Sequence, residues 1–112
     1  MDLREVLPGA TLIAEDLYRS AGDPVDVYIR AVQDYWEVFG ALRPAPARKE
    51  DQVFRYLLER NGAPGIYPGA FALRDGNVIY RVFCNSVHEV EAACRVVRAK
   101  VAVYGPKLLR MT

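Results

Sequence analysis

Apolar side chains recur at helical spacing over the longest patterned stretch of the chain, which begins after Asp23-Pro24 and reaches Gly40. Aspartate is a good N-cap residue, and proline fits the first position of a helix. Separations of three or four residues are typical of one face of an amphipathic helix. The pattern predicts a helix over 24–40 and a loop over 43–47. Its apolar positions are Val25, Tyr28, Ile29, Val32, Tyr35, Trp36, Phe39 and Leu42.

Two shorter segments flank this stretch. Residues 11–17 follow the turn residues Pro8-Gly9 and form a predicted first strand. A second helix is predicted from about Lys49 to Arg60, because it carries one apolar face and is followed by the C-terminal stop Asn61-Gly62. Residues 63–69 are a predicted loop, since two prolines and two glycines interrupt any regular structure. The apolar face of the second helix consists of Val53, Phe54, Leu57 and Leu58.

A β-hairpin is predicted around Asp75-Gly76-Asn77. The runs 70–74 and 78–83 have strand-like composition, and Asp-Gly readily adopts the positive φ angles of a tight type I′ turn. A two-residue turn would place one apolar set on the core face and a mixed set on the other face, whereas a three-residue turn would shift the register. The core set is Phe71, Leu73, Val78, Tyr80 and Val82, and the other set is Arg74, Ile79, Arg81 and Phe83.

A third helix is predicted immediately after the hairpin. Ser86-Val87-His88-Glu89 matches a capping box, in which the serine hydroxyl accepts from the amide three residues later. Apolar residues at Val90, Ala93 and Val97 continue the helix to about Arg98. Residues 101–104 are a predicted last strand, which ends at Gly105-Pro106.

Length and composition indicate a single soluble domain over residues 1–112. A chain of 112 residues has the common size of one domain, and its hydrophobic fraction of 52% is enough for one core. No apolar run approaches the roughly 18 to 20 residues that a membrane-spanning helix needs. The first five residues do not have the pattern of a secretory signal. We therefore expect a cytoplasmic protein.

No complete catalytic or metal-binding set is visible in the sequence. His88 is the only histidine, and Cys84 and Cys94 are the only cysteines, whereas zinc requires about four ligands at a recognisable spacing. The two thiols are expected to be partly buried and reduced. Asp34 and Glu37 are expected to lie on the solvated face of the first predicted helix. The sequence predicts no catalytic residue, no metal site and no cofactor.

Charge is distributed unevenly along a chain whose net charge is only +1. Residues 1–42 contain eight acidic and three basic residues, a net charge of −5, and residues 43–112 contain six acidic and twelve basic residues, a net charge of +6. The second part is therefore expected to face something anionic, with an ordinary solvated surface as the alternative.

Two groups of residues are candidates for contact with an anionic partner. On the hairpin, Arg74, Arg81 and Phe83 combine guanidinium groups with an aromatic ring, which is one way for an open sheet to hold RNA. An ordinary half-exposed sheet, or one buried against a partner, is the alternative. Basic residues near the C-terminus would contact phosphates in a salt-dependent manner, with simple solubility as the alternative. This second group is Arg95, Arg98, Lys100, Lys107 and Arg110.

Several stretches resemble the small α/β protein subunit of archaeal and eukaryotic ribonuclease P, called protein component 2 in archaea. Residues 13–15 are similar to its first core strand, and 31–34 followed by 38–40 are similar to its first helix, which commonly ends in Phe-Gly. Residues 79–82 and then 87–93, with the pattern Val-x-x-Val-x-x-Ala, are similar to its most recognisable strand and helix. The chain departs from the family by a longer segment over 43–69 and by lacking its Gly-Thr stretch near the last strand.

The resemblance implies an α+β fold of the ferredoxin-like or RRM-like sandwich type, with an antiparallel sheet and helices mainly on one face. It also implies a non-catalytic subunit that binds structured RNA, the ribonuclease P RNA, and a second, barrel-shaped protein subunit. The RNA, with its own Mg²⁺, would remove 5′ leaders from precursor tRNA. The two basic groups are then the expected RNA contacts, the acidic first part is the expected protein contact, and the isolated chain could form a homodimer.

Two hypotheses from other classes remain open. The chain could be a small protein–protein adaptor that dimerises through the hairpin edge or the first predicted helix, for instance in a tRNA-modification complex. It could also be an accessory protein of a mobile element or virus. Dependence of binding on salt would separate RNA contact from the adaptor.

Overall fold

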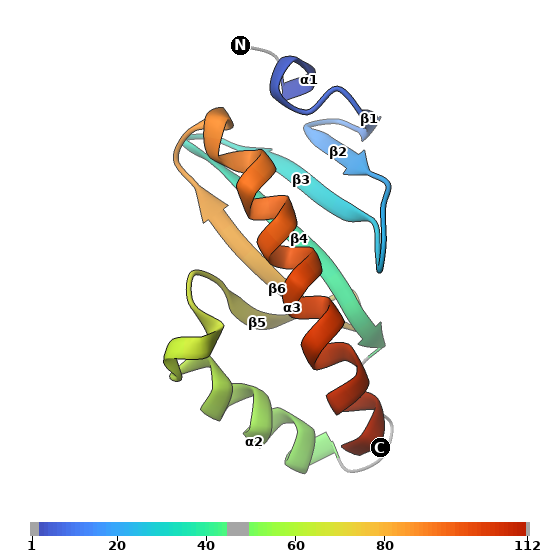
Figure 1. Cartoon of the computed structure of the whole chain (residues 1–112), viewed down its shortest axis with the longest axis vertical. Coiled ribbons are helices and arrows are strands. Elements are labelled where there is room, and N and C mark those ends of the chain that lie inside the picture. The colour runs from blue at the N-terminus through green and yellow to red at the C-terminus, as the bar shows by residue number, and fades with distance from the viewer. Residues whose placement is uncertain (1–2, 45–49, 112) are drawn as a thin grey trace.

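The computed structural model describes residues 3–44 and 50–111, which form a sheet of antiparallel strands with helices against it (Figure 1). The strands are β1 (Ala10–Ala14), β2 (Leu17–Ser20), β3 (Val27–Val32), β4 (Tyr35–Pro44), β5 (Ala70–Arg74) and β6 (Asn77–Cys84). The helices are α1 (Leu3–Val6), α2 (Glu50–Asn61) and α3 (Val90–Met111), and η1 (Pro64–Ile66) and η2 (Val87–Glu89) are 3₁₀ turns.

The six strands lie in the order β1-β2-β3-β4-β6-β5, and every neighbouring pair is antiparallel. The first four strands form a meander, after which α2 leads to β5 at the sheet edge and β6 returns beside β4. Figure 1 shows α3 lying across one face of this sheet and α2 beside the β5 edge. The predicted fold class is confirmed, because this is an α+β fold with helices mainly on one face, compatible with a ferredoxin-like arrangement.

The hydrophobic core lies between α3 and one face of the sheet, mainly on β4 and β6. A Cβ atom on Gly40 would lie 2.9 Å from a methyl carbon of Val97, so the absence of a side chain lets α3 approach β4 closely. All three helices contribute to this core, which includes Leu3, Ile29, Val38, Val53, Leu57, Phe71, Val78, Tyr80, Val82, Val90, Val97, Val101 and Leu108.

The predicted hairpin is confirmed, including its two-residue turn. Arg74 pairs with Asn77 across the turn, and Asp75 and Gly76 have φ angles of 52° and 78°. The register therefore directs the two predicted sets to opposite faces of the sheet. The prediction of α2 is also confirmed, and residues 63–69 form the expected connection, which includes η1.

The predicted helix over 24–40 is wrong, because this segment forms β3 and β4. The reason is that these strands carry large apolar side chains on both faces. Ile29 and Val38 point into the core, while Tyr28 and Phe39 stack on the opposite face. Two period-2 patterns superimposed in this way produce separations of three and four residues, which resemble one helical stripe. Asp34 and Glu37 consequently do not share a helix face.

The two terminal strand predictions also require correction. The predicted strand 11–17 is divided by a turn at Glu15-Asp16 into β1 and β2, and Asp16 has a positive φ of 57°. The predicted last strand 101–104 lies inside α3, which continues through Pro106 to Met111. Packing explains this continuation, since residues on both sides of the proline, Tyr104 and Leu108, pack on the core.

The predicted capping box does not form as expected. The hydroxyl of Ser86 accepts a hydrogen bond from the amide of His88 at 3.2 Å, and the amide of Glu89 donates to the carbonyl of Ser86 at 3.1 Å. The reason is that the first turn is the 3₁₀ turn η2, which brings a different amide to the serine hydroxyl. Among the described helices, none is long and apolar enough to span a membrane.

Candidate functional site: the open face of the sheet

One face of the sheet, here called the open face, is covered by no helix of residues 3–44 and 50–111. Side chains alternate along each strand, so residues that point away from the core point to this face. Two of them, Glu37 and Ile79, are buried but do not belong to the core cluster that the helices cover. The strand register places on the open face Leu17, Arg19, Tyr28, Arg30, Tyr35, Glu37, Phe39, Ala41, Arg74, Ile79, Arg81 and Phe83.

A carboxylate shared by two arginines lies at the centre of the open face. Glu37 on β4 is only 3% exposed, and Arg74 donates to both of its oxygens, at 2.6 and 2.8 Å. Arg81 Nη1 lies 3.7 Å from Glu37 Oε2, an ion-pair distance that exceeds a hydrogen bond. The hydrogen bond with Glu37 raises the pKa of Arg74 above its ordinary value, against the opposing effect of partial burial. The three groups together carry a net positive charge.

Each of the two guanidinium groups also lies over an aromatic ring. Arg74 lies 4.9 Å from the ring centroid of Phe39, and Arg81 lies 5.0 Å from that of Phe83. Each ring has an aromatic neighbour on an adjacent strand, because Phe39 stacks with Tyr28 at 5.6 Å and Phe83 meets Tyr35 edge-to-face at 5.2 Å. Contacts with a carboxylate and with a ring restrict each arginine to a defined position.

The open face is hollowed beside the Tyr28–Phe39 pair. The hollow has a volume of about 300 Å³, with an aliphatic floor and a polar rim. Its floor includes Ile79 and Ala41, and its rim includes Arg30, Arg74 and Asn77. The hollow is thus suited to holding a side chain or ring of a binding partner, and it contains no nucleophile with an adjacent base.

The three hairpin residues predicted to bind a partner lie together on the open face. Arg74 and Arg81 share Glu37, and Phe83 lies next to Arg81 with 51% of its surface exposed. The predicted juxtaposition of guanidinium groups and an aromatic ring is therefore present. That these residues bind RNA stays a prediction.

The five C-terminal basic residues all lie on α3, on the other side of the sheet. Arg98 donates to the carbonyls of Ser20 and Val25, and Lys100 donates to the carbonyl of Gly65. Arg95 lies 3.8 Å from Glu91, as an exposed ion pair. The structure thus separates the two predicted groups by the thickness of the sheet.

The remaining two residues of the second group are exposed near the end of α3. Lys107 Nζ lies 5.0 Å from the ring centroid of Tyr104, and Arg110 is in the last turn. Neither residue approaches the open face, so the eight predicted residues do not form one continuous surface.

Sequence reasoning missed the part of the open face that β3 and β4 supply. The predicted helix over 24–40 contains Tyr28, Tyr35, Glu37 and Phe39, and in a helix the two aromatic pairs could not form. A usable indication is the polar pair Gln33-Asp34, which forms the two-residue turn between Val32 and Tyr35. A strand–turn–strand reading of this segment would have placed these side chains beside those of the hairpin.

Outside the open face, the titratable residues of the described chain are scattered or buried. They contain no group of three or more His, Cys, Asp and Glu residues able to hold a metal ion. Burial raises the pKa of the thiols of Cys84 and Cys94 to about 11, so both are protonated at neutral pH and poor nucleophiles. His88 is exposed on η2.

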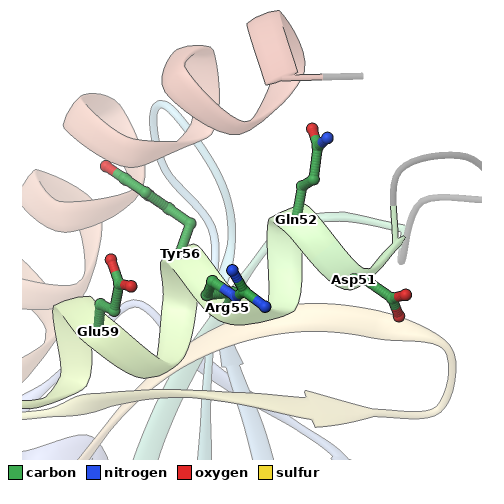
Figure 2. A pocket seen from close by; sticks show the side chains of 5 residues that line it. All are labelled: Asp51, Gln52, Arg55, Tyr56 and Glu59. Atoms are coloured by element: carbon green, nitrogen blue, oxygen red, sulfur yellow. The ribbon is translucent and has the colours of Figure 1, made fainter.

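A second hollow lies along α2, on the side toward α3. Figure 2 shows Gln52, Tyr56 and Glu59 projecting to one side of the helix, while Asp51 points away from them. Its volume is about 270 Å³, and its charged residues, which include Arg55, are all exposed. Exposed charges of mixed sign on a helix are typical of a solvated face, so we assign it no binding role.

An apolar groove lies between α2 and the edge strand β5. Its walls include Phe54, Leu58 and Leu73, and Leu58 is 73% exposed. The side chain of Asn61 also lines the groove, and it accepts from the amide of Phe71 at 2.7 Å and donates to the Phe71 carbonyl at 3.1 Å. These bonds satisfy backbone groups that an edge strand would otherwise offer to another strand.

Comparison with known proteins gives a likeness in fold. No protein-family model and no curated protein matches the sequence. The fold is similar to a chain in the structure of the heterodimeric complex ExoU-SpcU from the type III secretion system of Pseudomonas aeruginosa, with a TM-score of 0.64 and 14% sequence identity. The match covers 83% of each chain. At this identity, the likeness establishes a shared α+β fold.

Proposed function

We propose that this protein is a non-catalytic binding subunit that docks a second protein on the open face of its sheet. The observation that carries the proposal is the uncovered central surface, in which two arginines and four aromatic rings surround one buried carboxylate. Tyrosine, phenylalanine and arginine are the residue types enriched in protein–protein interfaces, and tyrosine and arginine also dominate binding hot spots.

The charge balance at the centre of the open face, where Glu37 lies between Arg74 and Arg81, favours a protein partner. Glu37 offsets one of the two central guanidinium charges, so this region lacks the row of unpaired cations with which single-stranded nucleic acid is usually held. The structurally similar chain described above comes from a complex of two proteins, which supports the proposal at the level of the fold.

Site-specific crosslinking in the cells of origin tests this proposal. A photoreactive phenylalanine analogue placed at Phe83 should crosslink to a single protein, whereas the same analogue at exposed Val103 on α3 should not. The identified protein should bind the purified chain in a fixed ratio, and Phe83→Ala should weaken that binding by about tenfold. A nuclease-sensitive adduct at position 83, or the same adduct from both positions, would contradict the proposal.

A second candidate function is the RNA-binding subunit of ribonuclease P, which supports a catalytic RNA in the 5′ maturation of precursor tRNA. The observation that favours it is the grouping of Arg74, Arg81 and Phe83, since guanidinium planes and exposed rings can stack with unpaired bases. Exposed Arg19 and Arg30 on neighbouring strands would add phosphate contacts.

Binding to ribonuclease P RNA over a salt series tests the second candidate. Affinity should fall steeply with salt, and Arg81→Gln should reduce the slope by about one. Arg81 is a better probe than Arg98, because Arg98 donates to the carbonyls of Ser20, the last residue of β2, and Val25. Binding that does not depend on salt, or no binding when the second protein subunit is present, would exclude this candidate.

A further inference from the structure

We infer that Arg81 and the Tyr35–Phe83 pair form a two-part subsite that recognises an acidic-x-aromatic sequence in an extended segment of the partner. The inference deepens the proposed function and depends on it, because it names the chemistry of the protein segment that the open face would take. Its three residues come from the adjacent strands β4 and β6.

Arg81 supplies the anion-binding half of the subsite. Its Nη1 is 3.7 Å from Glu37, whose two oxygens accept hydrogen bonds from Arg74. The Arg81 guanidinium makes no hydrogen bond to another residue in the described part of the chain, and the side chain is 35% exposed. The guanidinium is therefore oriented by Phe83 and by the charge of Glu37 while its donors remain available for a carboxylate.

Tyr35 and Phe83 supply the aromatic half. They meet edge-to-face with ring centroids 5.2 Å apart, and 38% and 51% of their surfaces are exposed. A third ring can pack against such a pair in an offset or edge-to-face arrangement and remove apolar surface from water. An exposed aromatic pair beside a cation is thus complementary to an aromatic side chain beside an anion.

The spacing of the two halves determines the spacing of the ligand. Arg81 and Phe83 are two residues apart on β6, which separates their Cα atoms by about 6.8 Å along the strand. In an extended partner segment, side chains two residues apart point to the same side and have this same separation. A carboxylate facing Arg81 and a ring facing the aromatic pair therefore require one residue between them.

Charge complementarity favours a polypeptide as the occupant. The subsite presents one available guanidinium, which matches the single charge of a carboxylate. A nucleic acid strand carries a phosphate at every nucleotide and is held by several cations along its path. A polypeptide segment can place one carboxylate and one ring in the subsite without bringing further charges that need partners.

Capped pentapeptides provide the test. The probes are acetyl-Gly-Glu-Ala-Phe-Gly-amide and the same peptide with Gln in place of Glu, titrated into the full chain and followed by NMR. The Glu peptide should bind about tenfold more tightly than the Gln peptide. Amide shifts should be confined to β4, β6 and their neighbours. Equal affinities of the two peptides would overturn the inference.

Matched variants show whether Arg81 is responsible. Arg81→Gln should abolish the preference for Glu, whereas Arg95→Gln, the same change on the exposed side of α3, should leave it intact. Phe83→Leu should weaken both peptides to a similar extent. Thermal unfolding of each variant controls for folding. Loss of the preference in Arg95→Gln as well would contradict a local site.

The same experiments distinguish failure of this inference from failure of the proposed function. If a protein crosslinks at position 83 but the Glu and Gln peptides bind equally, the docking face remains and the acidic-x-aromatic specificity is excluded. If a short oligouridine binds more tightly than the Glu peptide and competes with it, both proposals are overturned in favour of RNA.

Discussion

The two faces of the sheet are built from the same strands but are buried in different ways. On β4, the side chain of Val38 and the Cα of Gly40 face α3, while the side chains of Glu37 and Phe39 point to the open face. The covered face is apolar, with aliphatic side chains and the rings of Phe71 and Tyr80, and is closed by a helix of 22 residues. On the open face, side chains are partly buried by one another, through the ion pairs of Glu37 and the two aromatic ring pairs. Stability should therefore depend mainly on the covered face, and binding mainly on the open face.

The largest expected effect compares two isoleucines that are both buried, Ile29 under α3 and Ile79 on the open face. Ile29→Ala should lower the free energy of unfolding by about 3 kcal/mol, because the helix above it cannot close the cavity. Ile79→Ala should cost about half as much, since its neighbours can relax and water can enter the space.

Urea denaturation of both variants measures this difference. The slope of the free energy of unfolding against urea concentration should be the same as in the unchanged protein, so that a shift of the midpoint measures the change in stability. Equal losses at the two positions would show that the open face is as tightly packed as the core, and the comparison would break down.

The next effect concerns two arginines on α3 that were predicted to have the same role. Arg98 donates to carbonyl oxygens of Ser20 and Val25, whereas Arg95 makes only an exposed ion pair. Arg98→Ala should lower the free energy of unfolding by about 2 kcal/mol, because charged hydrogen bonds to partly buried carbonyls are lost. Arg95→Ala should change it by less than about 0.5 kcal/mol. Thermal unfolding of the two variants checks this contrast, and equal effects would refute it.

A smaller loss is expected from the centre of the open face. Glu37→Gln should reduce the free energy of unfolding by about 1.5 kcal/mol, since Arg74 and Arg81 lose their counter-charge but remain partly accessible to water. The same variant should also weaken partner binding, because Arg81 is no longer held in position. Chemical denaturation and the peptide titration measure the two effects separately. An unchanged stability would indicate that the ion pair contributes orientation alone.

A further effect, to which two thiols of the covered face contribute, is a dependence of stability on alkaline pH. Burial raises the pKa of the Cys84 and Cys94 thiols from 9.0 to about 11, so the unfolded chain loses these protons at lower pH than the folded one. Their contribution is fully present below pH 9 and is lost as pH rises toward 11, at about 1 kcal/mol per thiol at pH 10. Stability measured at pH 7.5 and pH 10 should fall less in a variant with both cysteines replaced by alanine. The same fall in that variant would assign the effect to other groups.

Elements that depend on neighbours in the sequence were predicted well. The Asp75-Gly76 turn, α2 and the split of the hairpin side chains between two faces all follow from local geometry. The same reasoning failed where large side chains occupy both faces of a strand, as in β3 and β4. It also failed at Pro106, where contacts of α3 with the core outweigh a local helix-breaking residue.

For the candidate site, the sequence was sufficient to place Arg74, Arg81 and Phe83 on one face, because alternation along a hairpin is a local property. Local sequence patterns could not predict that this hairpin pairs with β4, since the hydrogen bonds between β4 and β6 join residues far apart in the sequence. That pairing brings Glu37 between the two arginines and Tyr35 against Phe83, and it directs α3, with the second basic group, to the opposite side. The chemistry of the site was thus readable along the chain, whereas its assembly depended on long-range packing.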